Sequence, residues 1–98
     1  MHHMLVGLQI SNEQVYRQYR QAMKPILQRF GGDFLYDVQV SQVLKAQHGE
    51  AFNRLFVIAF PTAEQLEQFF VQPDYLAAKE EFFDASVEST HFLAQWPS

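Results

Sequence analysis

The chain has 98 residues, of which 48% are hydrophobic, and this size and apolar content predict a single domain over residues 1–98. Its formal charge of −4 argues against a nucleic-acid partner, and the lack of cysteine excludes disulfides, thiolate nucleophiles and cysteine-ligated metals. The same lack of cysteine fits a reducing, cytoplasmic location. We recognise no signal peptide and no apolar run of membrane-spanning length, so we expect no membrane partner.

The first part of the chain predicts a strand followed by a helix. Met4 to Ile10 is a short apolar run typical of a strand. Ser11 and Gln14 match a capping box, which predicts the start of a helix. An apolar stripe at helical spacing continues it and comprises Val15, Tyr19, Ala22, Ile26 and Phe30. Because Pro25 lacks an amide donor, we expect the helix to kink or split near residues 21–24.

Two further strands are predicted in the middle of the chain. Gly31-Gly32 ends the helix, because glycine adopts the left-handed cap conformation at little cost. Alternating residues over 33–46 predict the second strand, and residues 47–50 predict a polar turn. Phe52 to Phe60 reads as a third strand with apolar side chains on both faces. Such a strand is typical of a sheet that is covered on both faces.

The last part predicts two helices and a final strand. Thr62 with Gln65 repeats the capping-box pattern, and residues 72–74 break the helix that it starts. Residues 75–85 predict the next helix and residues 87–95 the last strand. The order βαββαβ predicts a ferredoxin-like α+β plait, a four-stranded antiparallel sheet with helices on one face.

Side-chain alternation divides each predicted strand between two faces. The predicted helix-facing set is Val6, Leu8, Ile10, Phe34, Tyr36, Val38, Val40, Leu55, Val57, Ala59, Thr90, Phe92 and Ala94. The apolar residues predicted on the open face are Leu5, Leu35, Phe56, Ile58, Phe60 and Leu93. An exposed apolar face of this size is unusual in a monomer, so we expect two sheets to pair face to face in a homodimer. The alternative is a monomer whose C-terminal tail partly covers the face.

Three motifs in register resemble the domain-of-unknown-function 1330 family, within the dimeric α+β-barrel superfamily. They are Gly31-Gly-Asp-Phe-Leu35, Phe60-Pro-Thr-Ala-Glu64 and Gln72-Pro-Asp-Tyr75. The resemblance extends over nearly the whole chain and implies a homodimer with a cleft between sheet and helices, and no agreed activity. The chain departs from the family pattern at Asp37-Val38, where an Arg-Gly pair is expected. A family role of that arginine in binding an anion therefore does not carry over.

Polar residues among aromatic ones on the predicted open face indicate a small-molecule site. The face combines Gln9, Asp37, Gln39, Arg54, Ser89 and His91 with Phe56 and Phe60. His91 is the candidate catalytic base, oriented by Asp37, because the pKa of a histidine lies near neutrality. Arg54, Gln9, Phe56 and Tyr75 are the candidate ligand-binding residues. Tyr75 is the first of four tyrosines to test as a phenol donor, since the family motif includes it. The alternative is that the polar groups of this face only pair across a dimer interface.

No cofactor or metal site is predicted, because no histidine pair with a nearby carboxylate has ligand spacing. Gly31-Gly32 precedes a strand, so it does not aim helix amides at a phosphate. Ala59 stands where an RNA-recognition strand would carry its last aromatic residue. Three functions remain open: a small-molecule-binding homodimer, a cofactor-independent monooxygenase or isomerase, and an interaction module without a ligand.

Overall fold

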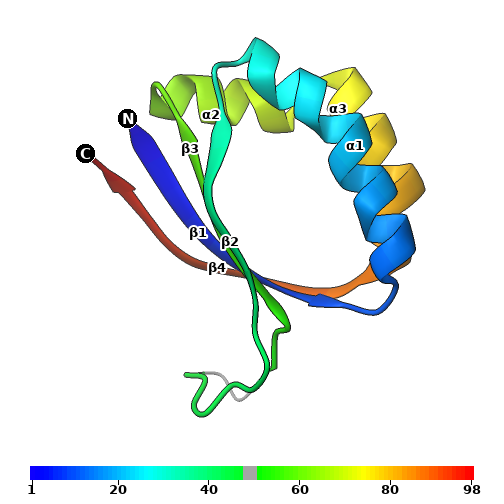
Figure 1. The fold of residues 1–98 in the computed structure, drawn as a ribbon. Helices are drawn as coiled ribbons and strands as arrows, with labels where there is room; N and C mark the ends of the chain where they lie inside the picture. The colour runs from blue at the N-terminus through cyan, green and yellow to red at the C-terminus, as the bar shows by residue number, and fades with distance from the viewer. Residues whose placement is uncertain (48–50) are drawn as a thin grey trace.

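The computed structural model describes residues 1–47 and 51–98, and its helices lie across one face of a curved sheet (Figure 1). The elements are β1 (His2–Ile10), α1 (Glu13–Arg29), β2 (Asp33–Gln39), β3 (Arg54–Phe60), α2 (Ala63–Phe70), α3 (Pro73–Ala78), η1 (Lys79–Phe83), α4 (Asp84–Ser86) and β4 (Val87–Pro97). The strands are ordered β2-β3-β1-β4, and all neighbours are antiparallel. This arrangement confirms the predicted ferredoxin-like α+β plait.

Helix α1 begins one residue later than its capping-box pattern predicts. The N-cap is Asn12, whose side chain accepts a hydrogen bond from the Val15 amide at 3.2 Å. The prediction of a capping box at Ser11 is therefore wrong. Ser11 instead donates two hydrogen bonds to the Ser86 carbonyl, from its amide at 2.8 Å and from its hydroxyl at 3.2 Å. These two bonds join the start of α1 to the start of β4.

Pro25 lies within α1, which continues for 17 residues without a split. Pro25 and Gln21, whose carbonyl loses an amide partner to the proline, are both exposed, so water can replace the missing hydrogen bond. The predicted apolar stripe is rotated relative to the buried face. Only Tyr19 and Ile26 of that stripe are buried, and the other buried residues of α1 are Tyr16, Met23 and Leu27.

The remaining element boundaries follow local signals. Gly31 has a φ of 72°, the left-handed conformation expected after α1. Thr62 caps α2 by accepting a hydrogen bond from the Gln65 amide at 3.1 Å. Pro73 opens α3, which continues through the π-helical turn η1 into α4. Strand β2 ends at Gln39, short of the predicted residue 46, and the predicted turn at 47–50 falls largely on residues outside the described ones.

Strand pairing corrects the predicted faces of β3. Val6 and Leu8 of β1 face the helices as predicted, and Met4 faces the same way. Val6 pairs with Phe56, Leu8 with Arg54 and Met4 with Ile58. Directly paired residues in an antiparallel sheet project from the same face. The prediction that Arg54, Phe56, Ile58 and Phe60 lie on the open face is therefore wrong. They face the helices, and Leu55, Val57 and Ala59 project from the other side.

Bulges correct the predicted faces of the two edge strands. Between Phe34 and Tyr36 the pairing of β2 shifts by one residue, so Tyr36 and Val38 turn to the open face while Asp37 turns toward the helices. In β4 a shift between Phe92 and Ala94 places Phe92 on the helix side and Ala94 on the open side, against the prediction for Ala94. Sequence alternation alone cannot locate such shifts.

The helix-facing side of the sheet forms the core with α1, α2 and α3. Phe60 and Phe69 are fully buried, and their ring centroids lie 5.5 Å apart. The open side is not covered by any helix (Figure 1). Its apolar residues include Leu5, Tyr36, Val38, Leu55, Val57, Ala59, Ala94 and Trp96. None of the helices among residues 1–47 and 51–98 is long and apolar enough to cross a membrane.

Candidate functional site

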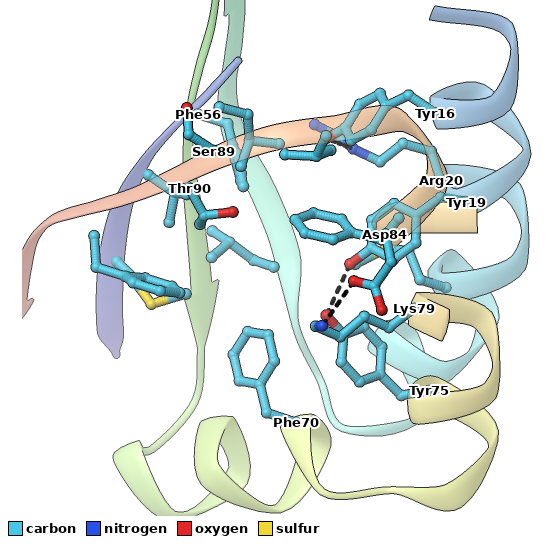
Figure 2. A pocket seen from close by; sticks show the side chains of 18 of the residues that line it. Tyr16, Tyr19, Arg20, Phe56, Phe70, Tyr75, Lys79, Asp84, Ser89 and Thr90 are labelled. Carbon is cyan, nitrogen blue, oxygen red and sulfur yellow. Dashed lines mark hydrogen bonds and ion pairs between the residues drawn. The ribbon is translucent and has the colours of Figure 1, made fainter. Parts of the chain in front are cut away.

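A partly open cavity of about 710 Å³ lies between the sheet and the helices. Its sheet wall consists largely of apolar side chains from β1 and β3, including Met4, Val6, Leu8, Phe56 and Ile58. Helices α1 and α3 form the opposite wall and carry its tyrosines, Tyr16, Tyr19 and Tyr75 (Figure 2). A cavity of this volume with mostly apolar walls and a few polar groups is typical of a small-molecule site.

Two tyrosine hydroxyls meet at the helical wall of the cavity. The hydroxyls of Tyr19 and Tyr75 lie 2.9 Å apart in a buried hydrogen bond (Figure 2). Burial raises the pKa of Tyr19 well above its ordinary value, and the neighbouring Tyr75 adds to this rise. Burial also raises the pKa of Tyr75, although the bond to Tyr19 opposes the change. Both phenols are therefore protonated at neutral pH, so they are hydrogen-bond donors and not bases.

A second polar cluster surrounds Arg20 at one side of the cavity. Arg20 donates from Nε to the Tyr16 hydroxyl at 2.8 Å and stacks on Phe34, with Cζ 3.7 Å from the ring centroid. Its Nη2 lies 3.1 Å from Asp37 Oδ1, without hydrogen-bond geometry. Burial raises the pKa of Tyr16, although Arg20 opposes the rise. Arg20 therefore links the tyrosine wall to the sheet.

Arg54 binds the same carboxylate from the sheet. Its Nε donates to Asp37 Oδ1 at 2.9 Å, and its Nη1 lies 3.4 Å from Glu13 Oε2. Burial alone would lower the pKa of Arg54, but the hydrogen bond and charge of Asp37, together with Tyr16 and Glu13, outweigh this effect, so the pKa is raised. The positive charges of Arg20 and Arg54 are balanced by the negative charges of Asp37 and Glu13. Arg54 is therefore already paired within the protein.

A third polar pair lies beside the tyrosines on the π-helical turn. Lys79 Nζ lies 2.9 Å from Asp84 Oδ1, and both residues line the cavity (Figure 2). The amide of Asp84 bonds to the Lys79 carbonyl, and this bond closes the wide turn of η1. The pair is about half exposed, so it marks the solvent side of the cavity.

The structure brings only some of the predicted site residues together. Phe56 and Tyr75 line the cavity, whereas Arg54 and Asp37 bind each other at one side of it. Gln9 and His91 lie on the opposite, open face, because His91 pairs with Gly7 and Gln9 with Ser89. Within one chain Asp37 therefore does not orient His91.

His91 has a different setting from the predicted one. Its Nε2 lies 3.3 Å from the Ser89 hydroxyl, and its ring lies 6.0 Å from that of Phe52. The Phe52 ring also packs on Gly7, where an added Cβ would come within 3.0 Å of it. These contacts form a small cluster on the open face, and of its members only Ser89 also lines the cavity.

Sequence reasoning missed Arg20 and the role of Tyr19. Both follow Tyr16 at spacings of three and four residues, which places all three side chains on one side of a helix. That spacing is the sequence signal for this cluster, whereas the predicted apolar stripe begins at Val15 and passes beside Tyr16 and Arg20. No group of three or more His, Cys, Asp or Glu side chains able to hold a metal lies within residues 1–47 and 51–98.

Comparisons with solved structures show the same fold in proteins of low sequence identity. A protein of unknown function from Rhodopseudomonas palustris aligns with a TM-score of 0.81 at 19% identity, over 99% of this chain and 81% of the other. A dimeric protein of unknown function with a ferredoxin-like fold from Bacteroides fragilis gives 0.62 at 12%, over 99% and 95%. The cofactor-independent oxygenase SnoaB from Streptomyces nogalater gives 0.65 at 11%, over 99% and 91%.

Sequence comparisons identify the family to which the chain belongs. No curated protein matches the sequence significantly. The family model described as Domain of unknown function (DUF1330) matches residues 2–95. This match includes all three motifs that carry the resemblance, from Gly31 to Tyr75. The chain therefore belongs to the DUF1330 family, whose members share no assigned function.

Proposed function

We propose that this protein is a homodimer that binds a small, mostly apolar molecule in the cavity between its sheet and helices. The observation that carries the proposal is the cavity of about 710 Å³, with apolar β1 and β3 side chains on one wall and the Tyr19–Tyr75 hydroxyl pair on the other. Drug-sized ligands fit cavities of this size, and a few polar groups in an apolar lining fix their orientation.

Binding fits the cavity better than catalysis does. A general base needs a free acceptor within reach of the proton that it removes. The Tyr19 and Tyr75 phenols are protonated, because burial raises the pKa of both. Asp84 is paired with Lys79, and Asp37 is shared by two arginines. Of the described acidic side chains that line the cavity, this leaves Glu88, an exposed residue.

We infer the homodimer from the open face of the sheet. Val57 pairs with Leu5 on one side and Tyr36 on the other, so this side of the sheet presents a continuous apolar row without a covering helix. Face-to-face pairing of two such sheets would remove this row from water in both subunits. The Bacteroides fragilis protein, which is described as dimeric, has the same fold and gives a precedent for this assembly.

Methionine methyl NMR tests the binding proposal with an internal control. Of the three methionines, Met4 and Met23 line the cavity and Met1 does not. Titration of the ¹³C-methyl-labelled protein with 1-naphthol should shift the Met4 and Met23 signals and leave Met1 in place. Saturation with no change at Met4 and Met23 would contradict binding in the cavity and would favour an interaction module without a ligand.

Sedimentation equilibrium tests the homodimer. The wild type should sediment as a dimer of 11.5 kDa chains. Val57→Glu places a charge at the centre of the open face and should give a monomer, whereas Leu44→Glu adds the same charge in an exposed segment outside the sheet. A wild type that is monomeric at micromolar concentration would contradict the assembly.

The second candidate is a cofactor-independent oxygenase. Its support is the shared fold with SnoaB, together with the phenolic donors in a mostly apolar cavity. A suitable probe reaction is 1-naphthol plus O₂ giving 1,4-naphthoquinone plus water, in which the substrate is oxidised and O₂ is reduced. Oxygen uptake above the uncatalysed rate that is lost in Tyr75→Phe would favour the oxygenase, and binding without uptake would favour the ligand-binding protein.

A further inference from the structure

The tyrosine wall of the cavity carries hydroxyl protons that no hydrogen bond of the described residues uses. Each phenol hydroxyl carries one proton and can also accept a hydrogen bond. The Tyr19–Tyr75 bond uses one of the two protons of that pair, and Tyr16 only accepts, from Arg20 Nε. Within residues 1–47 and 51–98, no hydrogen bond uses the two remaining protons. This wall therefore calls for a ligand that offers acceptor atoms.

The charges around the cavity argue that this acceptor is neutral. Arg20 and Lys79 are its described basic lining residues, and each already lies beside a carboxylate, Asp37 at 3.1 Å and Asp84 at 2.9 Å. Glu88 adds a negative charge to the lining. An anionic ligand would therefore lack an unpaired cation and would be repelled by nearby carboxylates.

The opposite wall determines the shape of the ligand. Met4, Val6 and Leu8 project from β1 beside Phe56 and Ile58 of β3, and together they form a broad apolar surface. A flat, apolar frame could lie on this surface while atoms at its edge reach the tyrosines. The arrangement thus combines an apolar sheet wall with a helical wall that offers two unused hydroxyl protons.

We propose that the tyrosine wall selects neutral carbonyl compounds, ketones or quinones on a flat apolar frame, by donating hydrogen bonds to the carbonyl oxygen. This inference rests on the proposed binding function and specifies the ligand class for the same cavity. The donors are the hydroxyls of the Tyr19–Tyr75 pair, assisted by Tyr16.

Three probes with one naphthalene frame test this selectivity. They are 2-ethylnaphthalene, which has no acceptor, 2-acetonaphthone, which has a neutral carbonyl, and 2-naphthoate, which is an anion. Their affinities are measured from the Met4 and Met23 methyl shifts. One net hydrogen bond corresponds to about a tenfold gain in affinity, so the ketone should bind about ten times more tightly than the hydrocarbon and also more tightly than the naphthoate.

The matched variants separate hydrogen bonding from shape. In Tyr19→Phe/Tyr75→Phe the preference for the ketone over the hydrocarbon should fall to about twofold or less, with hydrocarbon affinity retained. Tyr36→Phe, which removes an exposed hydroxyl from the open face, should keep the full preference. The double variant also loses a buried hydrogen bond, so the carbonyl stretch of 2-acetonaphthone bound to the wild type provides a second measurement that does not depend on folding of the variant. It should lie at lower wavenumber than in hexane.

Several results would overturn the inference. Equal affinities for ketone and hydrocarbon, or an unshifted carbonyl stretch, would remove the selectivity and leave the proposed binding function intact. Tightest binding of 2-naphthoate would indicate an anion site instead. Failure of all three probes to bind would overturn the proposed function together with the inference.

Discussion

The helix-facing side of the sheet and its open side both carry rows of apolar residues, yet they meet different partners. On the helix-facing side, Phe60 packs against Phe69 and is fully buried. On the open side, Tyr36 is 70% exposed and Val38 is 47% exposed. The strands thus present apolar side chains on both sides of the sheet. The side chains differ in exposure because the helices cover only one side.

The two sides also differ in how they treat polar groups. On the helix-facing side, Arg20 and Arg54 share Asp37, and Tyr19 bonds to Tyr75. On the open side, Ser89 and His91 form a small local pair. Pairing of buried polar groups is required because an unpartnered one costs about 1 to 3 kcal/mol. The helix-facing side is therefore suited to a specific pocket, and the open side to broad contact with another apolar surface.

The largest expected effect comes from Phe60→Ala. Removing this buried ring should lower the free energy of unfolding by about 3 to 5 kcal/mol, because the cavity left behind is enclosed by Phe69 and Phe70. Val38→Ala on the open side deletes a smaller side chain that is about half exposed within one chain, so it should cost less than Phe60→Ala. Urea unfolding at one fixed protein concentration measures both. Similar losses in the two variants would contradict the assignment of faces.

Arg54→Met should have the next largest effect. The change removes the hydrogen bond to Asp37 and leaves Glu13 without its cation, so we expect a loss of about 1.5 to 3 kcal/mol. Lys45→Met, which removes the same charge from an exposed position between β2 and β3, is the matched control and should change stability by less than about 0.5 kcal/mol. An effect of Arg54→Met no larger than that of the control would show that the cluster contributes little.

Tyr19→Phe tests the hydroxyl pair by a smaller change. It leaves the Tyr75 hydroxyl buried without its partner, which should cost about 1 to 2 kcal/mol. The Tyr36→Phe control should stay within about 0.5 kcal/mol of the wild type. A double-mutant cycle with Tyr75→Phe isolates the coupling between the two hydroxyls. Strict additivity would argue against a hydrogen bond between them in solution.

The smallest effect concerns Asp74 at the surface. Arg29 donates hydrogen bonds to this carboxylate at 3.1 and 3.4 Å and thereby lowers its pKa. Since the folded-state pKa lies below the unfolded value, the pairing contributes stability above the unfolded pKa, and this is lost as the pH falls through the folded pKa. In Arg29→Ala the pKa should rise, as measured by carboxyl ¹³C NMR, whereas Arg17→Ala on the same helix should leave it unchanged.

For much of the candidate site, the sequence indicated which residues take part but not where they lie in the fold. Tyr75 and Phe56 were predicted as ligand-binding residues, and both line the cavity, but Phe56 reaches it from the side of the sheet opposite to the predicted one. The pairing of His91 with Asp37 was not correct within one chain, because it depended on the parity of two strands. Arg20 was missed because its partners come from β2 and from its own helix, and one of them becomes available only after the bulge in β2.

Local signals and motif spacing in the amino-acid sequence were enough for the element order, the Thr62 cap of α2, the Gly31 end of α1, the ferredoxin-like plait and membership of the DUF1330 family. The side of β3 that meets the helices, by contrast, depends on how the strands pair in the folded sheet. Residues 54–60 are apolar on both sides, so burial alone could not distinguish them. Pairing of Val6 with Phe56 fixed the parity of β3, and the bulge after Phe34 then turned Asp37 toward the arginines.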